Sequence, residues 1–395
     1  MRTFKLLFLF FISIQCANAQ WYPVSSFDAA GRYHASSFVI GNKAIVGLGQ
    51  RITETKLYDL WCFDSNLQTW THKMNYPGLG SYAATTFSIN GKGYVCLGAD
   101  SYNIGQNDLW EYDPIAVSWT KKADFPAVGR YGACAFVIGD TAFVGTGSTG
   151  SNFLYDFYMY VPATDKWTKK ADFPGGSRVH AIAFALAGYG YAGTGYYSGY
   201  AYKDIWKYNK GADSWSRSAD INGVRAGAIS FVLANKAYIA TGYNMSSELN
   251  DMQKFNEDLN EWEVISNSNS LTTCHAASVF VIGNSAYVGT GYNNGQTLAN
   301  FMNYSVDGTY VIKVVGDSLI KVYYNQLTSR LSFDLEDLNE NCNMSIFNVN
   351  GQKVLSKNVS VEKNQIEING FLKGIYLLKI SNGNKTSVYK ILKNN

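Results

Sequence analysis

One stretch of this chain, WTKKADFPAVGRYGACAFVIGDTAFVGTGSTGSNFLYDFYMYVPATDKW, runs from Trp119 to Trp167 and contains every feature of a repeat. A Gly-Arg turn at residues 129–130 leads into an apolar segment, and a Gly-Asp turn at 139–140 separates it from a second one. Glycine beside aspartate suits a tight hairpin, and short apolar segments between turns indicate β-strands. A variable loop and two further segments follow, so the stretch predicts four antiparallel strands.

The tryptophan recurs along the chain at a nearly constant spacing. The separations are 49, 49, 48, 48 and 47 residues, and the positions are Trp21, Trp70, Trp119, Trp167, Trp215 and Trp262. A period near 50 marks a repeat array, and its length suits one four-stranded propeller blade. The sequence therefore predicts six blades.

The sixth repeat lacks a tryptophan after its third strand at residues 300–304, and the missing strand lies at the other end of the chain. Trp21 precedes Phe27 and Gly31 by the same intervals at which Trp119 precedes Phe125 and Gly129. We expect this N-terminal strand to complete the last blade and close the ring, which removes an exposed sheet edge.

The repeats resemble those of the kelch family, in which a glycine doublet is followed by a spaced tyrosine and tryptophan. The resemblance rests on the glycine signatures at residues 47–49, 145–147, 193–195 and 289–291 and on the aromatic segments at 59–63, 108–112 and 204–208. It departs from the family because the glycine doublet is mostly Gly-Thr-Gly. The resemblance implies an all-β, six-bladed kelch-type β-propeller over residues 20–307.

Residues 1–19 have the pattern of a secretory signal peptide. Arg2 and Lys5 precede an apolar run from Leu6 to Ile14, which is too short to span a bilayer, and a small-residue site ends at Ala19. Lipidation at Cys16 is the alternative, but Gln15 is too large for it. The five remaining cysteines have no metal or redox spacing, which favours buried apolar side chains over a disulfide.

Residues 308–395 read as short alternating strands that form a small β-sandwich. Residues 346–354 (IFNVNGQKV), residues 372–376 (LKGIY) and the basic end at 389–393 resemble the C-terminal sorting domain of the type IX secretion system. The resemblance implies the type IX secretion machinery as a partner and a secreted or outer-surface location in a Gram-negative bacterium. An ordinary adhesive sandwich is the alternative.

Arginines and histidines gather on one predicted face of the ring. Arg32, Arg130 and Arg178 lie eleven residues after the periodic tryptophan and Arg225 ten after, which points four guanidinium groups toward one rim. Arginine binds carboxylate and phosphate in a bidentate manner. The competing interpretation, slightly favoured, is that these arginines hold loops and backbone carbonyls together.

His34 and His180 lie thirteen residues after the tryptophan, and His275 does so with an ambiguous facing. His34 and His180 belong to opposite blades, so they meet only if the channel is narrow. A pair of histidines lacks the rest of a ligand set, so the sequence predicts no metal site and no cofactor.

Tyrosines follow three of the glycine signatures, and they suit recognition because tyrosine gives contact area at low entropic cost. They are Tyr196, Tyr197, Tyr243 and Tyr292. These loops are equally well explained as ordinary hydrophilic turns. The net charge of +3 is too weak to indicate a nucleic-acid partner, so none is expected, and no segment after the signal peptide is predicted to span a membrane.

The sequence favours a binding module for glycan or protein over an enzyme. The alternative is a carbohydrate-active propeller enzyme that uses the Arg/His face. The family resemblance offers two models for it, a sialic acid epimerase and galactose oxidase, and the arginines fit the first better.

Overall fold

The computed structural model describes residues 20–25, 27, 29–53, 55–65, 69–265, 271–305, 313–314, 321–325, 330–334, 342–360, 365–372, 374–382 and 385–393. These residues form strands and turns and no helix, so the all-β prediction is confirmed for them, and no helix there is long and apolar enough to cross a bilayer. The chain divides into a larger unit, residues 20–305, and a smaller one that holds residues 306–395. The predicted signal peptide lies outside the described residues.

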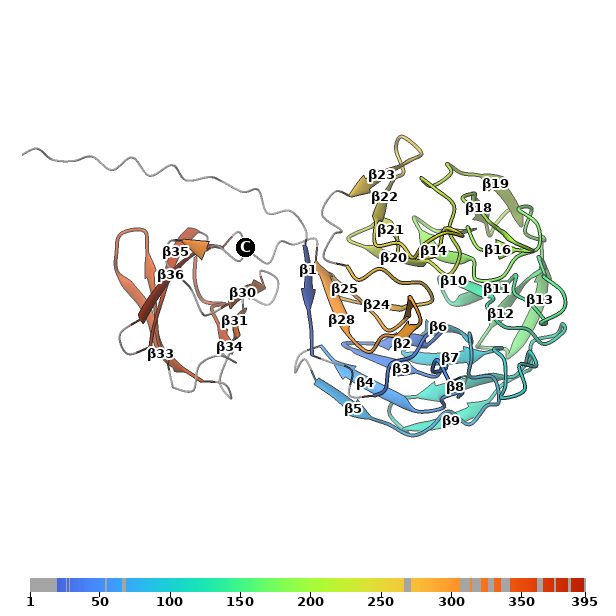
Figure 1. The fold of residues 1–395 in the computed structure, drawn as a ribbon, viewed down its shortest axis with the longest axis horizontal. Coiled ribbons are helices and arrows are strands. Elements are labelled where there is room, and N and C mark those ends of the chain that lie inside the picture. The colour runs from blue at the N-terminus through green and yellow to red at the C-terminus, as the bar shows by residue number, and fades with distance from the viewer. Residues whose placement is uncertain are drawn as a thin grey trace, which may run out of the picture. The chain divides into compact units, whose positions relative to one another are not determined.

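The larger unit contains six four-stranded antiparallel sheets, one for each repeat (Figure 1). Sheet 1 is β2 (Ser36–Ile40), β3 (Lys43–Gly47), β4 (Leu60–Asp64) and β5 (Thr69–His72). Sheet 2 is β6 (Thr85–Ile89), β7 (Lys92–Cys96), β8 (Leu109–Asp113) and β9 (Ser118–Lys121). Sheet 3 is β10 (Cys134–Ile138), β11 (Thr141–Gly145), β12 (Phe157–Val161) and β13 (Lys166–Lys170).

Sheets 4 to 6 repeat this order from an inner to an outer strand. Sheet 4 is β14 (Ile182–Leu186), β15 (Tyr189–Gly193), β18 (Ile205–Asn209) and β19 (Ser214–Arg217). Sheet 5 is β20 (Ile229–Leu233), β21 (Lys236–Ala240), β22 (Met252–Asn256) and β23 (Glu261–Ile265). Sheet 6 is β24 (Ser278–Ile282), β25 (Ser285–Gly289), β28 (Phe301–Ser305) and β1 (Gln20–Pro23). Two small hairpins, β16–β17 (Tyr196–Tyr197, Tyr200–Ala201) and β26–β27 (Tyr292–Asn293, Gln296–Thr297), extend the loops of sheets 4 and 6.

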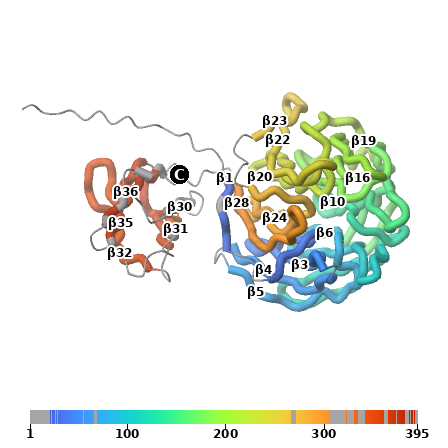
Figure 2. Tube along the Cα trace, viewed as in Figure 1, coloured from blue at the N-terminus to red at the C-terminus, as the bar shows by residue number. Residues whose placement is uncertain are grey.

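The inner strands contact one another in chain order, from β2 through β6, β10, β14 and β20 to β24, and β24 also contacts β2 (Figure 2). Hydroxyl groups bridge neighbouring sheets along this path. The Ser36 hydroxyl donates to the Ala84 carbonyl at 2.9 Å, and the Ser278 hydroxyl donates to the Ala35 carbonyl at the same distance. The last sheet is therefore bonded to the first.

The N-terminal strand pairs with the last repeat, as predicted. Trp21 of β1 lies opposite Tyr304 of β28, and their ring centroids are 5.1 Å apart. Trp21 is 4% exposed. Sheet 6 thus takes its outer strand from one end of the larger unit and its other three strands from the opposite end.

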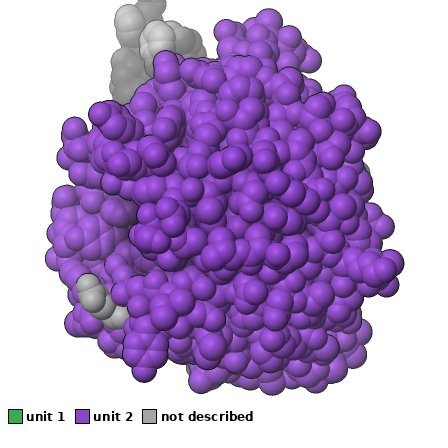
Figure 3. All heavy atoms as spheres, turned by 90° about the vertical axis from the view of Figure 1, so that its right-hand side faces the viewer, with its two compact units in different colours: residues 1–19, 306–395 green, residues 20–305 purple. Residues whose placement is uncertain are grey.

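Aromatic side chains pack each sheet against the next. The inner-strand phenylalanine of one sheet meets the outer-strand tryptophan of its neighbour edge-on, with Phe38 6.3 Å from Trp119 and Phe136 6.1 Å from Trp215. Edge-to-face pairs contribute roughly 0.5–1.5 kcal/mol beyond the area they bury. Gly93 lies beneath Phe38, where a Cβ would approach the ring to 2.1 Å, so only glycine fits there. Figure 3 shows one face of this larger unit with all of its heavy atoms drawn as spheres.

The first strand of each repeat begins three residues later than the sequence suggests. A strand that followed the turn at Gly31-Arg32 directly would begin at Tyr33, but β2 begins at Ser36. Tyr33 forms only an isolated bridge with Gln50, and His34 adopts a left-handed conformation with φ of 51°. A left-handed residue cannot continue a β-ladder, so the strand starts after it.

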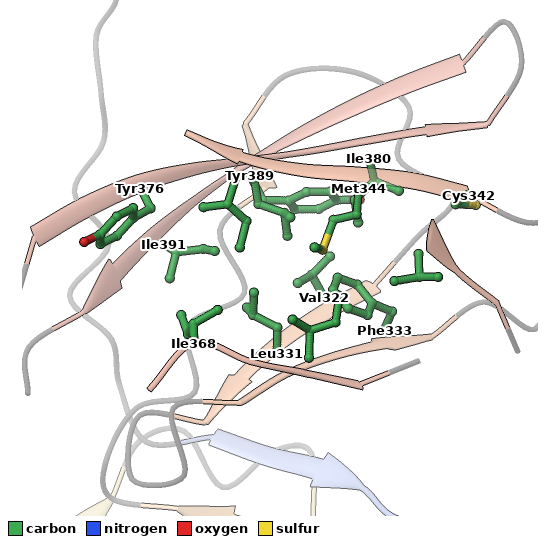
Figure 4. Close-up of a cluster of buried hydrophobic side chains, with 14 residues drawn as sticks. Val322, Leu331, Phe333, Cys342, Met344, Ile368, Tyr376, Ile380, Tyr389 and Ile391 are labelled. Atoms are coloured by element: carbon green, nitrogen blue, oxygen red, sulfur yellow. The ribbon is translucent and has the colours of Figure 1, made fainter. Parts of the chain in front are cut away.

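The smaller unit has two sheets with a hydrophobic core between them (Figure 4). One sheet has the order β29 (Lys313–Val314), β36 (Lys385–Lys393), β35 (Gly374–Asn382), β32 (Cys342–Asn348), β33 (Lys353–Val359). The other has the order β30 (Lys321–Asn325), β31 (Arg330–Asp334), β34 (Gln365–Glu367). A turn at Asn350-Gly351 joins β32 to β33, with Gly351 at a φ of 76°.

Cys62, Cys96, Cys134, Cys274 and Cys342 are buried, as the sequence favours, and none forms a disulfide in the described part of the chain.

Candidate functional site

The four predicted rim arginines are buried beneath the surface. Each is at most 1% exposed and bonds an aspartate that precedes the third strand of its own sheet. The pairs are Arg32–Asp59, Arg130–Asp156, Arg178–Asp204 and Arg225–Asp251, at 2.8, 2.5, 2.5 and 2.8 Å. Although burial raises the pKa of the Asp59 carboxyl, the bonds from Arg32 outweigh it and lower that pKa.

Each guanidinium is also bonded to the backbone. Arg130 Nη1 donates to the Thr146 carbonyl at 3.1 Å, and its Nε donates to the Val128 carbonyl at 3.2 Å. The guanidinium carbon lies 4.8 Å from the centre of the Phe125 ring. The expectation that these arginines face a ligand is therefore not met. Their contacts match the competing interpretation, in which they hold loops and backbone carbonyls together.

A closed circuit of six backbone hydrogen bonds lies at the inner ends of the sheets. Each residue of the circuit donates its N–H to the carbonyl of the equivalent residue in the preceding sheet, at 2.7–3.3 Å. In the order of the sheets, the six residues are His34, Ala83, Gly132, His180, Gly227 and Ala276. All six have φ between 50° and 62°. The left-handed conformation points the N–H and the carbonyl of each residue along the circuit. The circuit therefore also links sheet 6 to sheet 1.

His34 and His180 belong to this circuit, and their rings meet across it. The centroids are 4.2 Å apart and the planes are inclined by 26°, which is a stacked arrangement. Burial lowers the pKa of both imidazoles, that of His180 to about 4, and for His34 the neighbouring His180 lowers it further. Both rings are therefore neutral at pH 7.

His275 lies one position earlier in its repeat, which resolves the ambiguity in its facing. It occupies the place of Tyr33, while Ala276 occupies the place of His34 in the circuit. Its Nδ1 lies 3.7 Å from the carboxylate of Glu248. Burial lowers the pKa of His275, and Glu248 opposes that change.

Eight aromatic rings form a continuous network at this face, which we call the central cluster. Its members are Tyr33, His34, Tyr82, Tyr131, His180, Tyr243, His275 and Tyr292. Tyr33 lies 5.9 Å from Tyr82 on one side and 5.6 Å from Tyr292 on the other. The predicted residues His34, His180, Tyr243, His275 and Tyr292 are thereby brought together.

Tyr33, Tyr82 and Tyr131 are members of the central cluster that the sequence analysis did not select as site residues. The signal was present, because each is the residue directly after the Gly-Arg or Gly-Ser turn of its repeat. These tyrosines precede the left-handed residue of the backbone circuit, and the circuit is what turns them toward one another.

Tyr196 and Tyr197 lie in a separate group of rings. Both contact Phe153 of the preceding repeat, with centroids at 5.9 and 5.1 Å, and Tyr197 is 41% exposed. They belong to the β16–β17 hairpin. The structure therefore divides the predicted tyrosines between the central cluster and this hairpin.

The cavity at the centre of the circuit is small. Its volume is about 140 Å³, and it is lined by the segments 34–35, 83–84, 132–133, 180–181, 227–228 and 276–277. Ligand pockets usually measure roughly 300–1,000 Å³. The cavity is therefore smaller than a typical ligand pocket.

Charged groups are sparse around the central cluster. The Lys56 ammonium lies 4.4 Å above the Tyr82 ring and donates to Asn103 Oδ1 at 2.8 Å. Glu248 lies beside His275. Within the described ranges, no group of three or more His, Cys, Asp or Glu side chains is placed to hold a metal ion. The cluster can thus offer ring stacking and a few hydrogen bonds.

Comparison with known proteins gives a family match for the C-terminal part of the chain. No curated protein matches the sequence. Residues 321–394 match the family model of the secretion system C-terminal sorting domain. This match covers strands β30 to β36, whose core is described above. The chain therefore carries a type IX C-terminal sorting domain, which implies contact with the type IX secretion machinery and export to the cell surface or beyond in Bacteroidetes-type bacteria.

Proposed function

We propose that the larger unit is a six-bladed kelch-type propeller that acts as a binding module on the bacterial surface or in the medium. Six sheets built from six sequence repeats, with inner strands in contact in chain order, support the propeller assignment. The backbone circuit that joins sheet 6 to sheet 1 supports it further. The export signal supplies the location.

The main support for a binding function is the central cluster. The cavity at the centre of the backbone circuit is too small to hold a ligand, so the rings of the cluster are the surface that a ligand would contact. Aromatic rings stack on the apolar faces of sugars and on partner side chains, and tyrosine adds a hydroxyl at low entropic cost. Because the four arginines are bonded to aspartates, the cluster offers little charge to an acidic ligand. A neutral glycan is the ligand that this chemistry favours, and a protein surface rich in aromatic and apolar groups is the second choice.

A glycan array screened with the mature chain, residues 20–395, tests this proposal. Tyr82→Ala should weaken binding at least tenfold, because Tyr82 contacts Tyr33, His34 and Tyr131. Ile115→Ala is the matched control, since Ile115 is 94% exposed in the turn between β8 and β9, away from the cluster. Glycan binding that both variants retain in full would contradict the assignment of the face.

The alternative function is a carbohydrate-active enzyme at the same centre. Its support is the neutral, stacked pair of His34 and His180, either of which could accept a proton from a substrate hydroxyl. The arginines no longer support it. Turnover of a sugar that His180→Gly abolishes without loss of binding would favour the enzyme.

A further inference from the structure

A buried arginine–aspartate pair recurs in the repeats, and its positive and negative charges cancel. In sheets 1, 3, 4 and 5, Nη1 of the arginine donates to Oδ1 of its aspartate and to the carbonyl in the middle of the glycine signature. In sheet 6 both charges are replaced, because Cys274 stands at the arginine position and Asn300 at the aspartate position. Five of the six sheets therefore keep this position neutral overall.

Sheet 2 keeps the negative charge at this position without the positive one. Ser81 stands at the arginine position, but Asp108 remains at the aspartate position. Trp110 Nε1 donates to Asp108 Oδ2 at 2.8 Å, the same bond that Trp61 makes to Asp59 in sheet 1. The carboxylate is thus held as in the other sheets, and Oδ1 is the oxygen that lacks its guanidinium.

Three buried oxygens at this position have no hydrogen-bond partner. They are Asp108 Oδ1, the Ser81 hydroxyl and the Tyr76 hydroxyl. Ser81 is 0% exposed and Tyr76 is 3% exposed. Buried polar groups are nearly always bonded, so three that are not bonded in one place indicate a missing partner.

The Tyr76 hydroxyl lies near the Asp108 carboxylate, and Ser81 stands at the arginine position beside them in the repeat. Tyr76 takes the place of Phe27, Phe125 and Phe173, whose rings lie beneath the guanidinium groups of other sheets at 4.8–4.9 Å. A Cβ on Gly78 would lie 2.4 Å from the Tyr76 hydroxyl and 2.6 Å from Asp108 Oδ2, so both oxygens approach the same point. The Leu97 carbonyl occupies the position of the carbonyls that accept from Nη1 elsewhere, such as that of Thr146.

We propose that sheet 2 binds a monovalent alkali cation in place of the arginine, through the Asp108 carboxylate, the hydroxyls of Ser81 and Tyr76 and the Leu97 carbonyl. Hard cations take oxygen ligands, and this set contains oxygen alone. One carboxylate matches a single positive charge, which is the charge that the guanidinium supplies in the sister sheets. A calcium site usually combines several carboxylates, and this position has one.

Protonation of Asp108 is the competing way to neutralise the position. Burial raises the pKa of the Asp108 carboxyl, and hydrogen bonds from the Trp110 side chain and the Leu79 backbone oppose that rise. If Asp108 is protonated, the stability of the chain should not depend on which cation the buffer contains. If a cation is bound, the stability should depend on it. The two cases are therefore separable by experiment.

Thermal unfolding of the mature chain, residues 20–395, in chlorides of sodium, potassium or tetramethylammonium at equal ionic strength tests the proposal. We expect a midpoint higher by about 2–4 °C in sodium or in potassium than in tetramethylammonium. The alkali ion with the larger shift is the preferred occupant. Equal midpoints in all three salts would overturn the proposal and favour a protonated Asp108.

Two variants assign the shift to this position. Asp108→Asn reproduces the neutral state of sheet 6 and should abolish the difference between the salts. The triple variant Tyr76→Phe/Ser81→Arg/Cys96→Gly rebuilds the set found in sheet 3, Phe125 with Arg130 and Gly145, and should also lose the difference while remaining folded. An alkali-ion shift that survives in either folded variant would overturn the proposal.

A crystal soaked in thallium acetate without chloride, with thallium as the probe, gives a direct readout. An anomalous peak beside Asp108 Oδ1 would support the site, and an anomalous map without that peak would contradict it.

Discussion

His34 and His180 stack with their ring centroids 4.2 Å apart, although they come from the first and fourth of six sheets. Opposite members of a ring meet only where its centre is narrow, and the 140 Å³ cavity beside them is consistent with that. The contact places two neutral imidazoles at the centre of the backbone circuit, with tyrosines of the central cluster around them.

The histidine pair should make stability depend on pH. In the folded chain the pKa of His180 is about 4, below the ordinary value of 6.5, and that of His34 is lowered as well. Between these values the unfolded chain binds more protons than the folded chain, so stability falls as the pH drops from 6.5 toward 4. The expected loss is roughly 1–3 kcal/mol, measured by urea unfolding at a series of pH values.

The double variant His34→Gly/His180→Gly should flatten that pH dependence. Glycine already occupies the same circuit position in sheets 3 and 5, as Gly132 and Gly227, with the same sign of φ. His72→Gln, at an exposed histidine of β5, is the control and should leave the slope unchanged. An unaltered slope in the double variant would show that other groups cause the dependence.

Removing one buried arginine should destabilise the larger unit in the absence of any ligand, because the arginine's bonds are internal. Arg130→Ala leaves the Asp156 carboxylate and the Thr146 carbonyl without their donor, at a cost of about 3–5 kcal/mol in the free energy of unfolding. Adding Asp156→Asn should recover part of the loss, because that pair then resembles the neutral Cys274 and Asn300 of sheet 6. Denaturant unfolding of the two variants measures both changes.

Loss of the N-terminal tryptophan should weaken sheet 6 most. Trp21 is 4% exposed and packs on Tyr304, so Trp21→Ala should cost about 3–5 kcal/mol. Ile115→Ala, at a 94% exposed side chain, should change the free energy by less than about 0.5 kcal/mol. Hydrogen exchange should locate the loss in β28, and uniform loss over all six sheets would instead indicate that they unfold as one unit.

Export should depend on the C-terminal sorting domain. Deletion of residues 318–395 removes the segment that matches the sorting family and should trap the chain in the periplasm. Immunoblots of medium, surface and periplasmic fractions measure the distribution. A full-length Tyr82→Ala chain should be exported normally, and surface delivery of the truncated chain would refute the role of the domain.

The repeat made much of the fold predictable. The tryptophan period gave the number of sheets, the order of strands in each and the pairing of β1 with β28, because each repeat carries its own turns and its own apolar alternation. The start of the inner strands was misplaced by three residues. The cause is a left-handed residue stabilised by hydrogen bonds to neighbouring sheets, and no local signal in one repeat reveals such partners.

The candidate site was less predictable. The spacing placed Arg130 and Asp156 at fixed points of a repeat. Only their ion pair at 2.5 Å shows that the arginine bonds within its own sheet and does not face a ligand. One repeat alone gives no signal for Tyr82, because a tyrosine at the start of a strand is ordinary by itself. It becomes part of a site through rings from five other sheets.

The sequence by itself determined the repeated strands, the shared sheet of Trp21 and Tyr304 and the sorting domain at the end of the chain, because these depend on periodicity and on contiguous motifs. The tertiary structure decided what the polar residues do. Burial and partner choice turned the predicted rim arginines into internal ion pairs, brought His34 against His180, and left Asp108 without the arginine that pairs with the equivalent aspartate in four other sheets. Those outcomes depend on contacts between residues far apart in sequence, which local patterns do not encode.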